Sequence, residues 1–398
     1  MVSDFIQNDL LKTAHTDWIS VFKELIKYKP SEKKIVVIDE FQYIGKSNSA
    51  FPSIIQKAWD TVMKDNNIMF IICGSYISLM KSQALDYSSP LYGRRTAQIR
   101  LRQIDFSHYH EFYNNKPQDD LIPFYAVTGG VPKYIEVFDS YTDIYTAIEN
   151  NILNRQSFLY EEPFFLLQNE VTEIGSYFSL IKAIAFGNHK LSDIASEMGV
   201  KSTSVTKYLK TLIDLDLIER EVPITEANPE KSKSGLYKLT DNYIAFWFKF
   251  VYPYRSFLEK GETEFVLNKI KSGFIQNYVS FIYEDIAREK MWQLNLANTW
   301  SFNFDKLGRY WGSKCGEVDI VAIDSIEKNI ILGECKYTRS QKGLDVLNTL
   351  LEKGVVLQKL TKSKNIEYII FSSGGFTKGL LDEASRNPHI KLVSKIES

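Results

Sequence analysis

The sequence predicts a multidomain α/β protein, and three observations lead to this fold class. First, two apolar strand-like runs, IVVI at 35–38 and MFIIC at 69–73, are separated by helical patterns, as in a parallel α/β core. Second, residues 191–239 have the pattern of two short helices followed by two strands. Third, the strand-like runs VDIVAI and NIILGECKY flank a polar turn near the C-terminus. Several small sheets, each with its own helices, are therefore expected.

Length and composition indicate a folded chain of two to four domains. The 398 residues are 44% hydrophobic and 24% charged, which is typical of globular proteins. The formal net charge of -1 excludes a global attraction to nucleic acid, so any phosphate contact must come from a local basic patch. The three cysteines form no paired framework, and no apolar run is long enough for a bilayer. These features predict a cytoplasmic protein without a membrane partner.

The pattern along the chain predicts four regions. Residues 1–105 form an α/β region, and residues 106–165 form a helical and aromatic lid or connector. Residues 166–240 contain short helices and a strand pair, and residues 241–398 return to a mixed α/β pattern after connector helices. The dense aromatic run YIAFWFKFVYPY at 243–254 is predicted to form core between domains rather than a surface that stacks on bases.

Two adjacent acids, Asp39 and Glu40, follow the first apolar run. A parallel strand that is buried on both faces has such a continuous apolar run, and ligands of α/β folds bind just past its carboxyl end. Asp39 is therefore a candidate magnesium ligand, and Glu40 a candidate for orienting a water. Such a site also needs a phosphate loop of the form G-x-x-x-x-G-K-[ST], which the sequence lacks. The nearest string, Gly45-Lys46-Ser47, comes after the acids and has no earlier glycine at the required position.

Residues 166–240 have the pattern of a winged helix-turn-helix. The helix in HKLSDIASEMGV is followed by the helix in KSTSVTKYLKTLIDL and then by two strands around a basic loop. The inward positions of the second helix are Val205, Leu209, Leu212 and Ile213. The outward positions, which are candidates for contacting DNA, are Thr203, Thr206, Lys207 and Lys210. The alternative is a module that only packs domains together, because the outward face carries no arginine to read bases.

The strongest chemical pattern is GEVDIVAIDSIEKNIILGECKYT at 316–338. Its two strands are expected to pair as an antiparallel hairpin, and a symmetric turn places Asp319 opposite Glu334. Opposed carboxylates can share one hard cation. Lys336 lies on the same strand face as Glu334, while Cys335 points to the other face. Two metal ligands and an ammonium on one surface are what metal-assisted hydrolysis of a phosphodiester requires.

Glu284, in the helical stretch FIYEDIAREK, is a fourth candidate that supports this site from upstream. The alternative interpretation is a set of solvated ion pairs on surface strands. The apolar residues on either side of both strand acids favour the metal site, because they are unusual beside a plain solvated face.

The residues at this hairpin resemble a known pattern, and the chain as a whole resembles a known family. Asp319, the E-C-K of residues 334–336 and upstream Glu284 look like the PD-(D/E)xK pattern of restriction endonucleases and Holliday-junction resolvases. Over nearly its whole length the chain resembles the prokaryotic DEXX-box predicted ATPases (AAA/STAND-like), whose C-terminal domain of unknown function carries this nuclease-like core. The phrases that carry the resemblance are, in order, IVVIDEFQYI, CGSYISLM, PLYGRRT, TGGVPKYIEVF, LTDNYIAFWFKFV, and EVDIVA through GECKYT.

The resemblance implies a partial P-loop-type parallel α/β core, a helical lid, a winged helix-turn-helix and a restriction-endonuclease-like α/β domain. It implies that Asp39 and Glu40 are the magnesium-holding and water-activating acids of a Walker B strand. Ser75 would be the sensor of the γ-phosphate. Arg94 or Arg95 would contact that phosphate from a neighbouring subunit, so the resemblance also points to a homo-oligomer as a partner.

For the C-terminal domain, the resemblance implies that Asp319 and Glu334, supported by Glu284, hold Mg²⁺ or Mn²⁺. Lys336 would be the catalytic lysine and DNA the partner.

In this family a phosphate loop precedes the Walker B strand by more residues than the sequence has before Asp39. The expectation is that the loop lies outside the sequence and that the 398-residue chain binds ATP weakly or not at all. The expected function is that of an ATP-binding, ATPase-family protein with a metal-dependent nuclease-like domain that acts on DNA. The alternative is a non-catalytic switch that binds DNA or a partner, with degenerate ATPase and nuclease sites.

Overall fold

The computed structural model of the protein describes residues 17–29, 31–113 and 116–396. The chain forms two compact units, each with a sheet and a hydrophobic core of its own. The first unit comprises Met1–Leu101 with Leu166–Thr172, and the second comprises Arg102–Phe165 with Glu173–Ser398. Within the described ranges, no helix is both long and apolar enough to cross a bilayer.

The first unit contains a parallel pair of strands, β1 (Lys34–Ile38) and β2 (Ile68–Ile72). This pairing confirms the parallel pattern expected from the two apolar runs, and in its register Val36 lies beside Phe70. The helices described in this unit are α3 (Trp18–Lys27), α4 (Phe41–Ser47), α5 (Phe51–Ala58), α6 (Ile77–Met80) and the last residues of α11 (Glu162–Glu170).

One face of this small sheet packs on the core. The buried core residues are Phe22, Ile38, Phe41, Phe51, Ile55, Ala58, Met63, Ala84 and Leu91, and Val36, Phe70 and Ile72 pack against them. The alternate strand residues Ile35, Val37 and Met69 are 64%, 54% and 47% exposed. The expectation of strands buried on both faces is therefore wrong for the described part of the chain. Successive strand residues point to opposite faces, and the described helices cover only one of them.

The second unit begins with a helical region. Its first helices are α7 (Phe106–Tyr109), α8 (Ile122–Thr128), α9 (Pro132–Phe138) and α10 (Ile144–Ile148). The helix α15 (Asn242–Phe246) packs against α8 and continues into a wider helical turn at Trp247–Val251. Tyr243, Phe246, Trp247 and Phe248 are fully buried within the second unit, which confirms that these side chains form core. Their expected place between domains stays a prediction.

Gly130 has a steric role in this helical region. Its carbonyl accepts a hydrogen bond from the backbone N–H of Ile104, and a Cβ at Gly130 would fall 2.0 Å from the Ile104 carbonyl oxygen. Only glycine lets the two backbones approach this closely.

A segment of three helices and a strand pair comes next in the second unit. It consists of α12 (Ile174–Ala185), α13 (Leu191–Glu197), α14 (Ser202–Asp214), β3 (Ile218–Glu221) and β4 (Leu236–Leu239). The strands pair antiparallel, as expected. Val205, Leu209 and Leu212 are buried, but Ile213 is 37% exposed. The inward placement of Ile213 is therefore wrong, because it lies at the edge of the helix stripe that Leu209 and Leu212 define.

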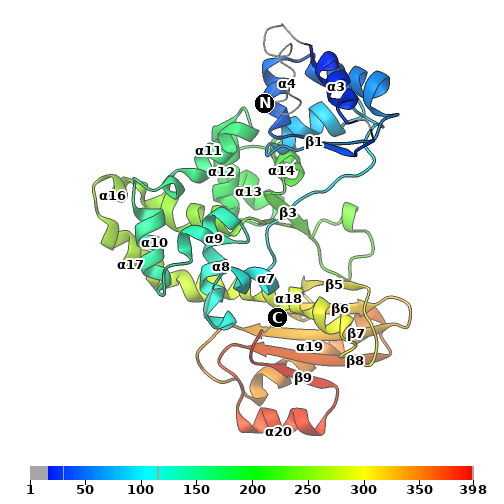
Figure 1. Ribbon diagram of the computed structural model, residues 1–398. Helices are drawn as coiled ribbons and strands as arrows, with labels where there is room; N and C mark the ends of the chain where they lie inside the picture. Colours follow the sequence, from blue (N-terminus) through cyan, green and yellow to red (C-terminus); the bar gives the residue numbers. More distant parts are fainter. Residues whose placement is uncertain (1–16, 30, 114–115, 397–398) are drawn as a thin grey trace. The chain divides into compact units, whose positions relative to one another are not determined.

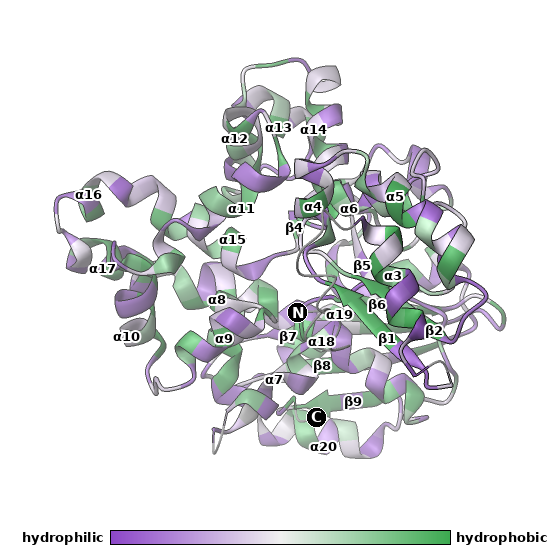
Figure 2. Ribbon diagram, turned by 45° about the horizontal axis from the view of Figure 1, so that its top comes forward, coloured by the Kyte–Doolittle hydropathy of each residue, from purple (hydrophilic) through white to green (hydrophobic). Residues whose placement is uncertain are grey.

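The C-terminal part of the second unit is a five-stranded sheet in the order β5-β6-β7-β8-β9 (Figure 1). β5 (Lys306–Gly312), β6 (Gly316–Asp324) and β7 (Asn329–Lys336) pair antiparallel, whereas β8 (Asn365–Ser372) and β9 (Ile390–Val393) continue from β7 in parallel. α18 (Ser280–Leu296), α19 (Leu344–Thr361) and α20 (Lys378–Arg386) contact this sheet. α16 (Arg255–Glu259) and α17 (Thr263–Phe274) instead belong to the helical region, where α17 packs against Trp247–Val251. In Figure 2, helices such as α17 and α20 carry both hydrophobic and hydrophilic bands, as expected where one side packs on a core.

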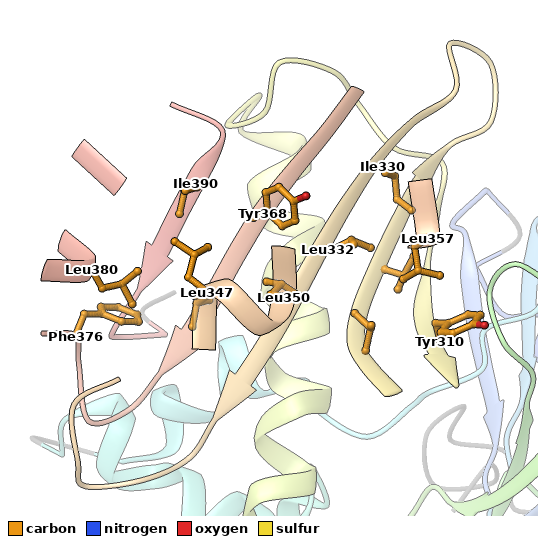
Figure 3. Packing of buried hydrophobic residues seen from close by; sticks show 13 residues of the cluster. Tyr310, Ile330, Leu332, Leu347, Leu350, Leu357, Tyr368, Phe376, Leu380 and Ile390 are labelled. Carbon is orange, nitrogen blue, oxygen red and sulfur yellow. The ribbon is translucent and has the colours of Figure 1, made fainter. Parts of the chain in front are cut away.

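Figure 3 shows the core on one side of this sheet. Leu347, Leu350 and Leu357 of α19 pack against strand residues that include Ile330 and Leu332 of β7. Gly354 of α19 lies close to two side chains of β8, since a Cβ there would lie 2.5 Å from the Tyr368 hydroxyl and 3.0 Å from Ile366 Cδ1.

Gly354→Val is expected to lower the stability of the protein by about 1–3 kcal/mol, because the added side chain would push α19 away from β8. The matched control is Gly175→Val on α12, where a Cβ would meet nothing within 4 Å. Thermal unfolding of both variants checks this. Equal unfolding temperatures for the two variants would contradict the close approach.

Candidate functional site

The two acids Asp39 and Glu40 lie just past the carboxyl end of β1. Glu40 adopts the left-handed conformation with φ 50, which is strained for a non-glycine residue, and α4 begins directly after it. The Ser75 hydroxyl, past the end of β2, donates to the Glu40 carboxylate at 3.0 Å. The buried Gln42 amide also donates to Glu40 and, at 3.3 Å, to Ser75. The structure thus brings Glu40 and Ser75 together and holds the Glu40 side chain in place.

Asp39 is exposed, and its carboxylate accepts hydrogen bonds from the Glu40 N–H at 2.9 Å and from the Cys73 thiol at 3.2 Å. The hydrogen bond to Asp39 raises the pKa of Cys73. Asp39, Glu40 and Ser75 therefore form one polar cluster at the carboxyl ends of β1 and β2, which is the edge of a parallel sheet where ligands bind.

The two candidate arginines have other partners within the first unit. Arg94 forms an ion pair with Asp60 at 2.8 Å and donates to the Pro90 carbonyl at 2.9 Å. Arg95 donates to the Gln98 side chain at 2.8 Å. The hydrogen bonds described for these guanidinium groups include none to Asp39 or Glu40.

The outward positions of α14 are exposed, as the helical pattern indicates. Thr203, Thr206, Lys207 and Lys210 all lie on the solvent side of the helix. Lys207 forms an exposed ion pair with Glu173 at 3.4 Å. This face combines hydroxyl and ammonium groups that are able to contact phosphates.

The hairpin of β6 and β7 has the expected register. Asp324 pairs with Asn329, and its carboxylate accepts hydrogen bonds from the backbone N–H groups of Ile326 and Glu327, which shapes the turn. The ladder continues to Ile320 and Gly333, one residue short of Asp319 and Glu334.

The pairing of β6 with β5 has a bulge near the residue of β6 where its ladder with β7 ends. Gly308 pairs with Val321 and Tyr310 with Val318, so two steps along β5 correspond to three along β6. A bulge changes the direction in which a side chain points, and bulges are frequent next to active sites. The Asp319 carboxylate accepts a hydrogen bond from the Cys335 N–H at 2.9 Å, which fixes it against β7.

Glu334 is held by two ammonium groups. Lys336 Nζ donates to its Oε1 at 2.6 Å, and Lys353 Nζ, from α19, donates to its Oε2 at 3.3 Å. Lys353 also donates to the Glu317 carbonyl at 2.7 Å. Sequence reasoning does not find Lys353, because only the packing of α19 on the sheet brings it to β7.

Glu284 lies near two arginines. Its Oε2 is 4.0 Å from Arg288 and 3.9 Å from Arg309. Arg288 is one helical turn further along α18, a spacing that the sequence displays. Arg309 comes from β5 and also pairs with Glu221 of β3 at 2.9 Å. Three elements of the second unit therefore meet at this group of charges.

Burial shapes the protonation of the acids. Burial, followed by the charge of Asp319, raises the pKa of Glu284 to about 8, although Arg288 and Arg309 oppose this. Burial and the charge of Glu334 raise the pKa of Asp319 to about 6. Burial lowers the pKa of Lys336, but its hydrogen bond to Glu334 and the negative charges of Glu334 and Asp319 together outweigh burial, so the pKa of Lys336 is raised. Burial is therefore the main reason that Glu284 and Asp319 hold their protons to a higher pH than usual.

The donor atoms of Asp319 and Glu334 fit a hard divalent cation. Carboxylate oxygens suit Mg²⁺ and Mn²⁺, and Mg²⁺ commonly takes one or two protein carboxylates together with waters and substrate phosphates. A cation would also relieve the repulsion between the two carboxylates. Across the residues that the structure describes, no three His, Cys, Asp or Glu side chains are grouped to hold a metal ion.

Two family models match separate parts of the chain. A model described as an ATPase domain predominantly from Archaea matches residues 2–138. A model described as archaeal and bacterial proteins of unknown function matches residues 247–346, which include Glu284, Asp319, Glu334 and Lys336.

Two relatives come from Methanocaldococcus jannaschii. The uncharacterized protein MJECL04 is 36% identical over 327 residues, which are 82% of this chain and 71% of that protein. The uncharacterized protein MJ0424 is 33% identical over 73 residues, which are 18% of this chain and 71% of that protein. Among solved structures, protein VC1899 from Vibrio cholerae is 12% identical over 95% of this chain and 91% of that chain, with a TM-score of 0.23, which is too low to indicate a shared fold.

In metal-free buffer, Asp319→Asn is expected to stabilise the protein at pH 8 by on the order of 2 kcal/mol. The pKa of Asp319 is higher in the folded chain, about 6, than its ordinary value of 3.8, so the folded state binds more protons between these values. Stability is therefore lost as the pH rises through this window, and the uncharged amide avoids that loss. Thermal unfolding at pH 4 and pH 8 measures the difference.

The exposed Asp382→Asn on α20 serves as the control for this measurement. A gain for Asp319→Asn that is equal at pH 4 and pH 8 would show that burial of the charge is not its cause.

Proposed function

Because the chain belongs to the family of MJECL04, an ATPase family with a C-terminal domain of unknown function, we propose that it is a metal-dependent DNA nuclease coupled to an ATPase-type domain. The nuclease activity is assigned to the five-stranded sheet. The proposal includes a PD-(D/E)xK-like core around β6 and β7, a winged helix-turn-helix at α12–β4, and DEXX-box acids after β1.

The observation that carries the proposal is the group of partly buried charges at one end of the β6–β7 hairpin. Asp319 is 9% exposed, and its carboxylate accepts a hydrogen bond from the backbone N–H of Cys335, the residue after Glu334. Lys336 lies on the same strand and contacts Glu334 at 2.6 Å. A plain solvated surface would leave these acids exposed and their pKa values unshifted, whereas here burial raises the pKa of Asp319.

In the proposed reaction Asp319 and Glu334 hold Mg²⁺ or Mn²⁺, with Glu284 as a supporting acid. The ion supplies Lewis-acid polarisation of the phosphate and lowers the pKa of a bound water. Lys336 keeps its positive charge and its ammonium contacts Glu334. It can therefore stabilise the negative charge that develops on the phosphate when water attacks.

The first unit and the helix-turn-helix have supporting roles in the proposal. Asp39 would hold magnesium and Glu40 would orient a water, with Ser75 in contact with Glu40. Arg94 and Arg95 would act on a neighbouring subunit of a homo-oligomer. Thr203, Thr206, Lys207 and Lys210 supply the exposed face for DNA phosphates.

The proposal is tested by cleavage of single-stranded, duplex and branched DNA with Mg²⁺ or Mn²⁺. Asp319→Asn and Lys336→Ala are each expected to reduce cleavage by about 100-fold or more, because each removes a group that acts on the transition state. Glu327→Gln, an exposed acid in the turn of the same hairpin, should cleave like the wild type.

Two outcomes would overturn the nuclease assignment. One is cleavage that persists at the wild-type rate in both variants. The other is the absence of cleavage on every substrate by wild-type protein whose folding is verified by circular dichroism. The second outcome would favour a non-catalytic switch that binds DNA or a partner.

A further inference from the structure

Both carboxylate oxygens of Glu334 are engaged, each by a different lysine. Lys336 is the neighbour on β7, and Lys353 comes from the middle of α19. The two contacts differ in their surroundings: the Lys336 side chain is 37% exposed and the Lys353 side chain 20%. The two ammonium groups are therefore not equivalent.

Lys353 is the more firmly placed of the two. Its ammonium makes a second hydrogen bond, to the Glu317 carbonyl of β6 at 2.7 Å, so it connects β6 and β7. Its helix packs on the sheet through Leu347, Leu350 and Leu357. An ammonium with two acceptors on a rigid element loses little freedom when it orients a carboxylate.

We propose that Lys353 is a positioning residue for Glu334, an inference that rests on the proposed nuclease function. Lys353 keeps Oε2 of Glu334 occupied, so the carboxylate offers only Oε1 to a divalent cation. Lys336, which holds Oε1 at 2.6 Å, releases it and turns its ammonium toward the phosphate of the DNA. Lys353 thereby orients the metal ligand Glu334, and Lys336 contacts the substrate.

The proposal predicts an unusual combination of effects for Lys353→Met. Without the ammonium, Glu334 can rotate and offer both oxygens, so Mn²⁺ in the absence of DNA is expected to bind severalfold more tightly. The ion is then held in a different position, so kcat should fall about 10- to 100-fold while KM for DNA changes little. A general disturbance of the site would instead weaken Mn²⁺ binding.

The experiment measures free Mn²⁺ by electron paramagnetic resonance during titration of the full chain, and kcat and KM on the DNA substrate that the wild type cleaves. Lys359→Met, an exposed lysine on the same helix, is the matched control and should leave all three quantities unchanged. Lys353→Gln, which keeps a donor for the Glu317 carbonyl, is the second variant and should show the same pattern if Lys353→Met does not fold.

If the wild type cleaves DNA and the Lys353 variants keep a kcat within twofold of it, the inference about Lys353 is overturned. The proposed nuclease function is then still supported. A lower kcat accompanied by weaker Mn²⁺ binding would also overturn it, because it would indicate damage to the site. Absence of cleavage by the wild type would overturn the proposed function, and the inference with it.

Discussion

The C-terminal site depends on the concentration of carboxylates in a partly buried place and on the cations that hold them there. An isolated buried carboxylate costs several kcal/mol, so each acid needs a counterion or hydrogen-bond donor. These partners come from different elements: Arg288 from α18, Arg309 from β5, Lys336 from β7 and Lys353 from α19. The geometry of the acids is therefore set by how the helices pack on the sheet.

This packing explains how the folded domain can hold buried acids whose pKa values are raised. α19 covers one face of the sheet with a continuous apolar core (Figure 3), and the strand β7 is buried over most of its length. The core offsets the cost of holding Glu284 and Asp319 at raised pKa values of about 8 and about 6. Proteins commonly accept such a cost at sites that bind a cation or act on a substrate, since the ligand relieves it.

Sequence patterns were informative wherever the determinants were local. The hairpin register follows from a symmetric turn between two apolar strands, and the neighbourhood of Glu334 and Lys336 follows from the strand period of two. The bulge beside Asp319, and the approach of Lys353 and Arg309, depend on contacts between distant segments and leave no periodic trace. The open face of β1 was missed for a related reason. An apolar run indicates that a strand is at least partly buried, but it does not show whether helices cover one face of the strand or both.

The proposed function requires one arrangement: a divalent cation shared by Asp319 and Glu334, with Lys336 moved away from Glu334. Its most direct test is a crystal structure of the full chain with Mn²⁺, using anomalous scattering to locate the ion. We expect an anomalous peak in contact with both carboxylates, with Lys336 Nζ no longer bonded to Glu334 and Lys353 still in place. Saturating Mn²⁺ with no peak at these residues, and with the Lys336–Glu334 contact retained, would contradict a shared cation site.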